Sequence, residues 1–342
     1  MPSLDVFAAD AFTMTSLVAK VDQIPFVPGA AGKLGIFDEE GTYTTTLEVE
    51  ERAGGLYLIP NTQRGAPAVQ NTRDKRKLRL FKHFHFPVRD YITADEIQNK
   101  RAFGSETDLQ MAEMEVQQRM MKMTKSLDAT VEYGRIGALQ GVILDSDGAT
   151  TLYNLFTEFG VTQTTVDFLL GTSTTNVIGK CETVRAAIQD VLGADGSEDI
   201  QVTAFVGKTF FDELITHPNV VRAYQYYQTL SQAQNPLQQD IRYTGFKFGG
   251  ILFKVYRGSV SGIPFIPAAQ GTAFPVGVPD IYATYFAPGD YMETANTLGR
   301  PRYAKMAPDP SGFNKFWAIE MQSSPISLCL RPGVLVALTT SN

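Results

Sequence analysis

The sequence predicts an α+β protein organised around one very long helix. Residues 105–139 can form a single helix, because their apolar side chains recur every three or four positions. Residues 34–85 have the pattern of an extended β-hairpin, and residues 246–342 read mostly as short strands separated by turns. The combination predicts a mixed fold that carries extended appendages.

The composition is that of a folded chain large enough for two domains, or for one body with arms. Its 342 residues are 44% hydrophobic and 19% charged, and the formal net charge is -6. An acidic chain argues against a dedicated nucleic-acid binder, which needs a broadly basic surface. Residues 1–20 lack the pattern of an export signal, and no apolar run approaches the roughly 20 residues needed to cross a bilayer. The two cysteines, Cys181 and Cys329, lie among apolar neighbours, and we expect a reducing cytoplasm.

The pattern of residues 1–33 predicts an extended amino-terminal arm. Their apolar positions are scattered, and the segment ends in turn residues at Pro25, Pro28 and Gly29. Such a segment can hardly form a core by itself, so we expect it to lie across another surface.

The predicted hairpin sorts its charges by strand. Acids gather on the outgoing arm, which includes residues 42–49 and 56–60, and bases gather on the return, which includes residues 78–88. Residues 61–72 form a tip rich in Gly, Pro, Gln and Asn. The charged side chains that can pair across the hairpin or with a neighbouring copy are Glu39, Glu40, Glu48, Glu50, Glu51, Arg73, Lys75, Arg76, Lys77 and Arg79.

A long two-stranded hairpin is marginal in water, so this one needs a surface to lie on. Two alternatives remain open, a solvated ribbon on an ordinary monomer and a nucleic-acid patch. The second is disfavoured, because the basic cluster has no interleaved aromatic residue before Phe81 and has acids opposite it.

The long helix has a start signal in Ser105 and Asp108, three positions apart. Met111, Met114 and Met121 lie off its main apolar stripe, which indicates that the helix is covered on more than one side. At about 1.5 Å per residue it would run about 50 Å, as a strut does. Its main apolar stripe consists of Leu109, Ala112, Val116, Met120, Met123, Leu127 and Val131.

The elements after the long helix are shorter. A second hairpin is predicted at residues 142–144 and 152–161, followed by a helix that Asn176 caps and Gly193 ends. The further expected elements are a strand at 201–206, a helix from Lys208 to His217, a helix at 220–234, and strands at 246–256, 281–286, 316–330 (broken at Pro325) and 334–339.

No catalytic, cofactor-binding or metal-binding constellation emerges, and we expect a protein that is not an enzyme. The glycine-rich phosphate motifs and the G-x-S-x-G motif do not occur. His83 and His85 could offer two metal ligands, but no third is spaced nearby, so we expect surface or interface histidines. Residues 145–148 resemble the opening of a calcium loop without its closing glutamate, and predict a turn.

Three local motifs carry a resemblance to a known family. FWAIEMQSSP at 316–325 runs into ISLCL at 326–330 and a Pro-Gly before the last strand; FFDEL at 210–214 precedes His217-Pro218 and VRAY; and YTGF at 243–246 precedes GGI at 249–251. In this order along the chain they resemble the major capsid proteins of tailed bacteriophages, the lambda-type (gene E-like) family with the HK97-like fold.

The resemblance implies a domain division. It comprises an N-terminal arm at 1–33, an extended loop at 34–85, a peripheral domain at 86–172 with residues 105–139 as its spine helix, an axial domain at 173–300, a return to the peripheral sheet at 301–330, and a last axial strand at 331–342.

The resemblance also implies a structural function. Many copies would form the hexamers and pentamers of an icosahedral virion shell, assembled in the host bacterial cytoplasm around double-stranded DNA that is bound without sequence specificity. The implied partners are a separate scaffold, a portal and a decoration protein, with no membrane. We expect no large cleaved prosegment, and no covalent crosslink through Lys75, Lys77 or Asn71. The alternatives are an encapsulin-like nanocompartment shell and a cytoplasmic hydrolase or binding enzyme, for which the sequence offers no constellation.

Overall fold

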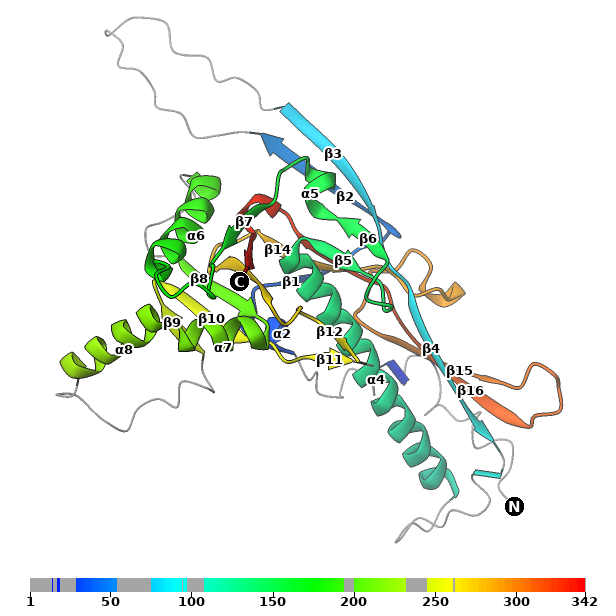
Figure 1. Cartoon of the computed structure of the whole chain (residues 1–342). Helices are drawn as coiled ribbons and strands as arrows, with labels where there is room; N and C mark the ends of the chain where they lie inside the picture. The colour runs from blue at the N-terminus through cyan, green and yellow to red at the C-terminus, as the bar shows by residue number, and fades with distance from the viewer. Residues whose placement is uncertain are drawn as a thin grey trace, which may run out of the picture.

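The long helix α4 (Asp108–Gln140) is the spine of the molecule and crosses it diagonally in Figure 1. The computed structural model describes residues 14, 17–18, 29–53, 75–93, 95–96, 108–193, 200–231, 245–260 and 262–341. Within that part of the chain α4 has 33 residues, close to the expected 105–139. Ser105, the expected start signal, lies outside the described residues.

The first half of α4 packs on a three-stranded antiparallel sheet in the order β15-β16-β4. The strands are β4 (Phe86–Thr93), β15 (Tyr303–Pro308) and β16 (Phe316–Ser323). Met120 and Leu127 of the helix share an apolar cluster with Ile319 of β16. Leu17 is fully buried in the same cluster, so at this point the amino-terminal arm lies on its own chain.

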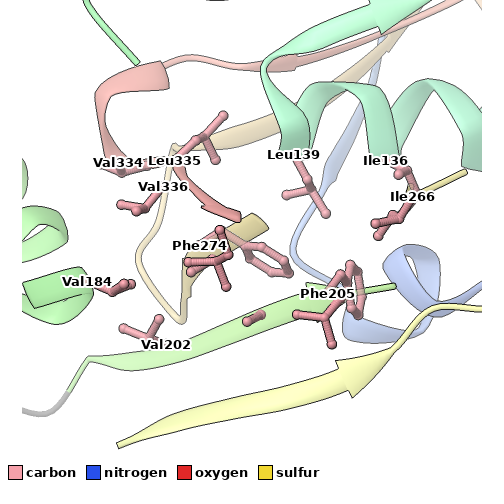
Figure 2. Close-up of a cluster of buried hydrophobic side chains, with 14 of the residues drawn as sticks. Ile136, Leu139, Val184, Val202, Phe205, Ile266, Phe274, Val334, Leu335 and Val336 are labelled. Atoms are coloured by element: carbon pink, nitrogen blue, oxygen red, sulfur yellow. The ribbon is translucent and has the colours of Figure 1, made fainter. Parts of the chain in front are cut away.

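The second half of α4 enters a larger core. Figure 2 shows Ile136 and Leu139 pointing into the same cluster as Phe205 and Phe274. Two of these side chains come from a six-stranded mixed sheet in the order β7-β18-β13-β8-β10-β9. Its strands are β7 (Thr164–Asp167), β8 (Gln201–Val206), β9 (Phe246–Phe248), β10 (Ile251–Val255), β13 (Gln270–Val276) and β18 (Val336–Thr339).

Helices and a small second sheet complete this core. Both α6 (Val177–Leu192) and α7 (Lys208–Thr216) contact strands of the six-stranded sheet, and α8 (Pro218–Ser231) follows α7 directly. The second sheet has the order β1-β14-β17, and its strand β17 contacts α4. Its strands are β1 (Asp38–Gly41), β14 (Tyr282–Phe286) and β17 (Pro325–Cys329).

The charged hairpin pairs β2 (Thr46–Ala53) with β3 (Lys75–Lys82), and in Figure 1 it runs away from the body. Its expected tip at 61–72 lies outside the described residues. The remaining elements are α2 (Ala30–Leu34), the pair β5 (Val142–Leu144) and β6 (Thr151–Asn154), α5 (Leu155–Phe159), the pair β11 (Ser259–Val260) and β12 (Ile263–Pro264), η4 (Met292–Thr294) and η5 (Pro332–Val334).

Four expected strands are wrong in extent. The strand at 42–49 begins only at Thr46 and continues to Ala53. The strand at 78–88 ends at Lys82, and the chain joins a different sheet from Phe86 onward. The strand at 152–161 gives way to α5, because the Asn154 side chain accepts hydrogen bonds from the N–H groups of Phe156 and Thr157 and starts a helix. The strand at 246–256 is a hairpin, because Gly249 and Gly250 adopt φ of 56° and 80°, which favour a tight turn.

Several expected boundaries are confirmed. Asn176 caps α6, with its Oδ1 accepting from the Gly179 N–H at 3.1 Å, and Gly193 follows the helix end. The strand at 201–206 is β8, and the break near Pro325 separates β16 from β17. The start expected for the helix at 220–234 is wrong, because α8 begins two residues earlier, at Pro218, and proline suits a first helical turn.

Candidate assembly surfaces

The root of the charged hairpin packs on its own chain. Phe81 is fully buried, and its ring lies 5.5 Å from that of Tyr153. Arg79 is also buried and donates hydrogen bonds to the carbonyl oxygens of Glu158 and Phe159. Its guanidinium lies 4.7 Å from the centre of the Phe159 ring. Within its own chain the Arg79 side chain is therefore engaged at α5.

The opposite face of the hairpin is exposed and carries both leucines and glutamates. Leu78 and Leu80 are 58% and 64% exposed in the single chain. Directly across the hairpin, Glu50 pairs with Leu78 and Glu48 with Leu80, so these four side chains share one face. Two leucines exposed side by side on one strand form a small apolar patch on this face.

Charge pairing across the hairpin is less regular than the sequence predicts. Glu51 stands opposite Lys77, as expected, but Arg52 stands opposite Arg76. Lys75 occupies the last described pair of the ladder, and Arg73 lies outside the described residues. The register therefore leaves a surplus of positive charge towards the tip.

Glu39 and Glu40 do not belong to the hairpin, contrary to the sequence prediction. Both lie in β1, which pairs in parallel with β14 in a separate sheet. Glu39 forms an ion pair with Arg135 of α4, whose side chain is 3% exposed. Glu40 is exposed and stands opposite Tyr285. β1 ends at Gly41, and residues 43–45 bend the chain before β2 begins at Thr46, so the acids at 39–40 and those at 48–51 lie on separate strands.

A polar stripe on α4, which sequence reasoning missed, fastens three distant segments to the spine. Asp128, Glu132 and Arg135 are all buried, at spacings of four and three residues along one helix face. Arg135 binds β1 as described, and its Nε donates to the Thr284 Oγ1 of β14 at 3.3 Å. The sequence signal for this stripe was the recurrence of Asp128, Glu132 and Arg135 at the same three- and four-residue spacing as the neighbouring apolar side chains.

Glu132 anchors the end of the amino-terminal arm. One carboxylate oxygen accepts from the Ala31 N–H at 2.8 Å and the Tyr256 hydroxyl at 3.1 Å, and the other accepts from the Gly32 N–H at 3.1 Å. Burial and the nearby Glu132 carboxylate raise the pKa of Tyr256 well above its ordinary value. A side chain at Gly29 would lie 2.2 Å from the Glu132 Oε1, so this close approach requires glycine.

Asp128 and Arg302 form a buried ion pair between α4 and the start of β15. The Arg302 Nη2 lies 2.8 Å from the Asp128 Oδ1, and the Nε donates to the same oxygen at 3.0 Å. Burial raises the pKa of Asp128, although the neighbouring guanidinium opposes the shift. The pair fixes the return of the chain into the sheet on which α4 rests.

His83 lies at the junction of the hairpin with two sheets. It is 7% exposed, so of the two settings expected, surface or interface, the surface setting is wrong for this residue. Its Nδ1 is 3.3 Å from the Ser324 carbonyl oxygen, and its Nε2 is 3.3 Å from the Thr42 Oγ1. Burial lowers the pKa of His83 below its ordinary 6.5. His85 contacts the Ser324 hydroxyl at 3.2 Å and remains exposed.

The described residues were compared with the requirements of a metal site, a reactive thiol and a membrane-spanning helix. They contain no group of three or more His, Cys, Asp or Glu side chains arranged to hold a metal ion. Burial raises the pKa of both Cys181 and Cys329 to about 12, which keeps the thiols protonated. None of the helices in this part of the chain is both long enough and apolar enough to cross a bilayer.

Comparison with known proteins identifies the family. Residues 13–340 match the model of the family described as Phage major capsid protein E. The chain belongs to this family. The major capsid protein of Pseudomonas phage KPP10 is 33% identical over 340 residues, covering 95% of this chain and 96% of that protein. The major capsid protein of Salmonella phage Felix O1 is 26% identical over 358 residues, covering 95% of each.

The fold comparison agrees with the family. The crystal structure of the putative capsid protein of a prophage from E. coli CFT073 superposes with a TM-score of 0.57 at 13% identity, covering 97% of this chain and all of that chain. The mixed α+β architecture with a spine helix is therefore the HK97-like capsid fold that the sequence resemblance implies. Members of this family are structural proteins of phage heads.

Proposed function

We propose that many copies of this chain form the hexamers and pentamers of an icosahedral head that encloses double-stranded phage DNA. The observation that carries the proposal is a match to phage major capsid proteins along nearly the whole length of both chains. The same proposal includes assembly in the host bacterial cytoplasm with a separate scaffold and a portal, and a decoration protein outside the shell.

The domain division implied by the resemblance is part of the proposal. The three-stranded sheet β15-β16-β4 with the first half of α4 corresponds to the peripheral domain. The six-stranded sheet with α6 and α7 corresponds to the axial domain, and β18, the last strand, lies inside that sheet between β7 and β13. The hairpin β2-β3 corresponds to the extended loop.

The net charge suits a container for DNA. A wall rich in phosphate contacts would hold DNA through counterion release and oppose its dense packing. A chain with a formal charge of -6 avoids that adhesion, and the DNA would be enclosed without sequence-specific contacts.

We propose that the charged hairpin makes contacts between copies of the chain. The face that carries Leu78, Leu80, Glu48 and Glu50 is exposed in the single chain. We propose Glu48, Glu50, Glu51, Arg73, Lys75, Arg76 and Lys77 as contact residues. Of the other predicted contact residues, Glu40 is exposed on β1, while Glu39 and Arg79 are bound within their own chain.

The test is assembly of the purified full chain, followed by sedimentation velocity and electron microscopy. Closed shells are expected, and a species that remains a small monomer at high protein concentration would contradict the proposal. Changing Arg73, Lys75, Arg76 and Lys77 to glutamate is expected to impair shell formation while the unassembled subunit keeps its melting temperature. Equal loss of both would show that the outer hairpin is internal to the fold.

A further inference from the structure

A groove of about 530 Å³ lies beside the middle of α4. It is bounded by the helix, by the β5-β6 pair with its turn, and by the β11-β12 pair, which brings together three segments distant in sequence. The apolar side chains that line it include Phe84, Ile143, Leu152, Ile263 and Phe265, and each of these five is buried or half-buried. Small-molecule pockets occupy about 300–1,000 Å³ and are likewise lined mainly by apolar side chains.

Two lysines stand on the helix side of the groove. Lys122 and Lys125 are exposed and lie three residues apart, so they project from the same face of α4. Within the described part of the chain, neither lysine has a carboxylate within ion-pair distance. Burial and the charges of Asp147 and Asp145 raise the pKa of Tyr133, so these two acids lie towards the other end of the groove. The lysine end therefore attracts an anion, and the other end repels one.

Gly134 keeps the groove open at its other end. It lines the groove from within α4, and a Cβ placed on it would meet nothing from other parts of the described chain within 4 Å. Glycine weakens a helix interior relative to alanine. Gly137 has a packing reason, because its Cβ would lie 3.0 Å from the Val142 carbonyl oxygen. Among the described residues no such contact explains Gly134, and its missing side chain leaves room for an occupant.

The distance between the lysines and this glycine sets the length of the occupant. Lys125 and Gly134 are nine positions apart, which corresponds to about 13.5 Å along the helix axis. An extended chain of single bonds advances about 1.1–1.2 Å per bond, so a chain of about 12 carbons spans this distance. The helix residues between them that line the groove include Ser126, Ala129 and Thr130, which have short side chains. Both hydroxyl groups donate to carbonyl oxygens of the same helix, so neither needs a partner from the groove.

We propose that the groove binds a single-chain amphipathic anion, of which a fatty acid of about 12 carbons is the simplest example. The carboxylate lies between Lys122 and Lys125, and the hydrocarbon chain runs along α4 to the space beside Gly134. The lysines then offset the negative charge, and the apolar walls cover the chain. This inference goes beyond the proposed function, because it concerns a small molecule bound by each subunit and not a contact between copies.

A free ligand is favoured over a membrane surface. A surface that binds membranes presents its large apolar side chains outward, on one exposed face. Here the five apolar side chains named above line a hollow and are buried or half-buried. The charge is also confined to one end of the groove, which suits one head group at the end of one chain.

The test is isothermal titration calorimetry of the full chain, below the protein concentration at which it assembles. The probes are dodecanoate, decanoate and decylammonium, each below its micellar concentration. Dodecanoate is expected to bind about ten-fold or more tightly than decanoate, because each of its two further methylene groups contributes about four-fold when buried. Decylammonium is expected to bind at least about ten-fold more weakly than decanoate, because the lysines repel its charge.

Two substitutions at one position test the location of the chain. Gly134→Leu is expected to weaken dodecanoate binding about ten-fold or more, because the new side chain fills the space beside the helix. Gly134→Ala is the matched control, since it adds a single methyl group, and it is expected to bind within about three-fold of the unmodified chain. Leucine and alanine both favour a helix more than glycine does, so neither variant is expected to lower the melting temperature of the subunit.

The lysines are tested by removing their charge. Lys122→Gln with Lys125→Gln is expected to weaken dodecanoate binding about five- to ten-fold and to remove the preference for decanoate over decylammonium. Lys208→Gln with Lys247→Gln, at exposed lysines elsewhere, is the matched control and is expected to change neither.

Four results would overturn the inference. The first is no binding of dodecanoate by the unmodified chain at millimolar concentrations. The second is equal affinity for decanoate and decylammonium, because the lysines would then take no part. The third is dodecanoate binding that Gly134→Leu leaves unchanged, and if that variant also fails to assemble, the groove belongs to a neighbouring copy. The fourth is co-sedimentation with phosphatidylglycerol vesicles without binding of dodecanoate, which would assign the groove to a membrane surface.

Discussion

Replacing Glu132 with alanine tests the attachment of the amino-terminal arm to the spine helix. The substitution removes the acceptor of three donors, namely the buried N–H group of Ala31 and the half-buried N–H group of Gly32 and hydroxyl of Tyr256. A hydrogen bond to a charged group contributes about 1.5–3 kcal/mol. Because the three bonds share one carboxylate they are not additive, so we expect a loss of about 3–6 kcal/mol in the free energy of unfolding.

The assay is urea unfolding of the unassembled subunit, followed by circular dichroism. Glu132→Gln keeps one acceptor oxygen and is expected to lose about half as much stability. Gly29→Ala perturbs the same contact from the other side, because its new methyl group would lie 2.2 Å from the Glu132 Oε1, and it is expected to destabilise as well. A loss below about 1 kcal/mol for Glu132→Ala would refute the reasoning, because the carboxylate would then not be the anchor.

Three further changes probe the fold. Asp128→Ala leaves the Arg302 guanidinium buried without its partner, and it is expected to lower the free energy of unfolding by about 3–5 kcal/mol in urea titrations; a cost near zero would show that water replaces the carboxylate. His83→Gln tests pH dependence. Because burial lowers the pKa of His83 from 6.5, the unfolded chain binds the proton more readily, so this residue lowers subunit stability as the pH falls below about 6.5 and has no effect above it. The melting temperature of the unmodified chain should therefore fall more between pH 7 and 5.5 than that of His83→Gln, and parallel curves would contradict the assignment. Phe81→Ala removes a fully buried ring at the hairpin root and is expected to cost about 3–5 kcal/mol by the same urea assay, whereas a cost under about 1 kcal/mol would mean that the root detaches freely.

Regular elements were predictable from local pattern and capping chemistry. The three- and four-residue spacing of Met120, Met123 and Leu127 identified α4, and each of these side chains is buried. Asn176 and Gly193 marked both ends of α6. The buried cysteines also followed from their apolar neighbours.

Strand partners were not predictable, because they depend on contacts distant in sequence. The run 78–88 alternates as one strand, yet the chain changes sheets at His83, where Thr42 and Ser324 supply the hydrogen-bonding partners. In the sequence Glu39 is grouped with the acids of the hairpin. Its ion pair with Arg135 depends on the tertiary fold and could not be predicted.

The candidate surface was predictable only in outline. Charge sorting located the hairpin, but the register determines which side chains share a face, and it placed leucines opposite Glu48 and Glu50. The hairpin was expected to need a surface to lie on, and its root has one in α5 of the same chain. Among the described side chains of the hairpin, those of Leu78, Leu80, Glu48 and Glu50 remain exposed.

The central claim is that this subunit is completed by copies of itself. A cryo-electron microscopy reconstruction of particles formed by the full chain tests it most directly. The account predicts closed shells of hexamers and pentamers in which each β2-β3 hairpin covers a neighbouring subunit, with Leu78 and Leu80 buried. Shells in which both leucines face solvent, or a chain that forms no shell, would contradict it.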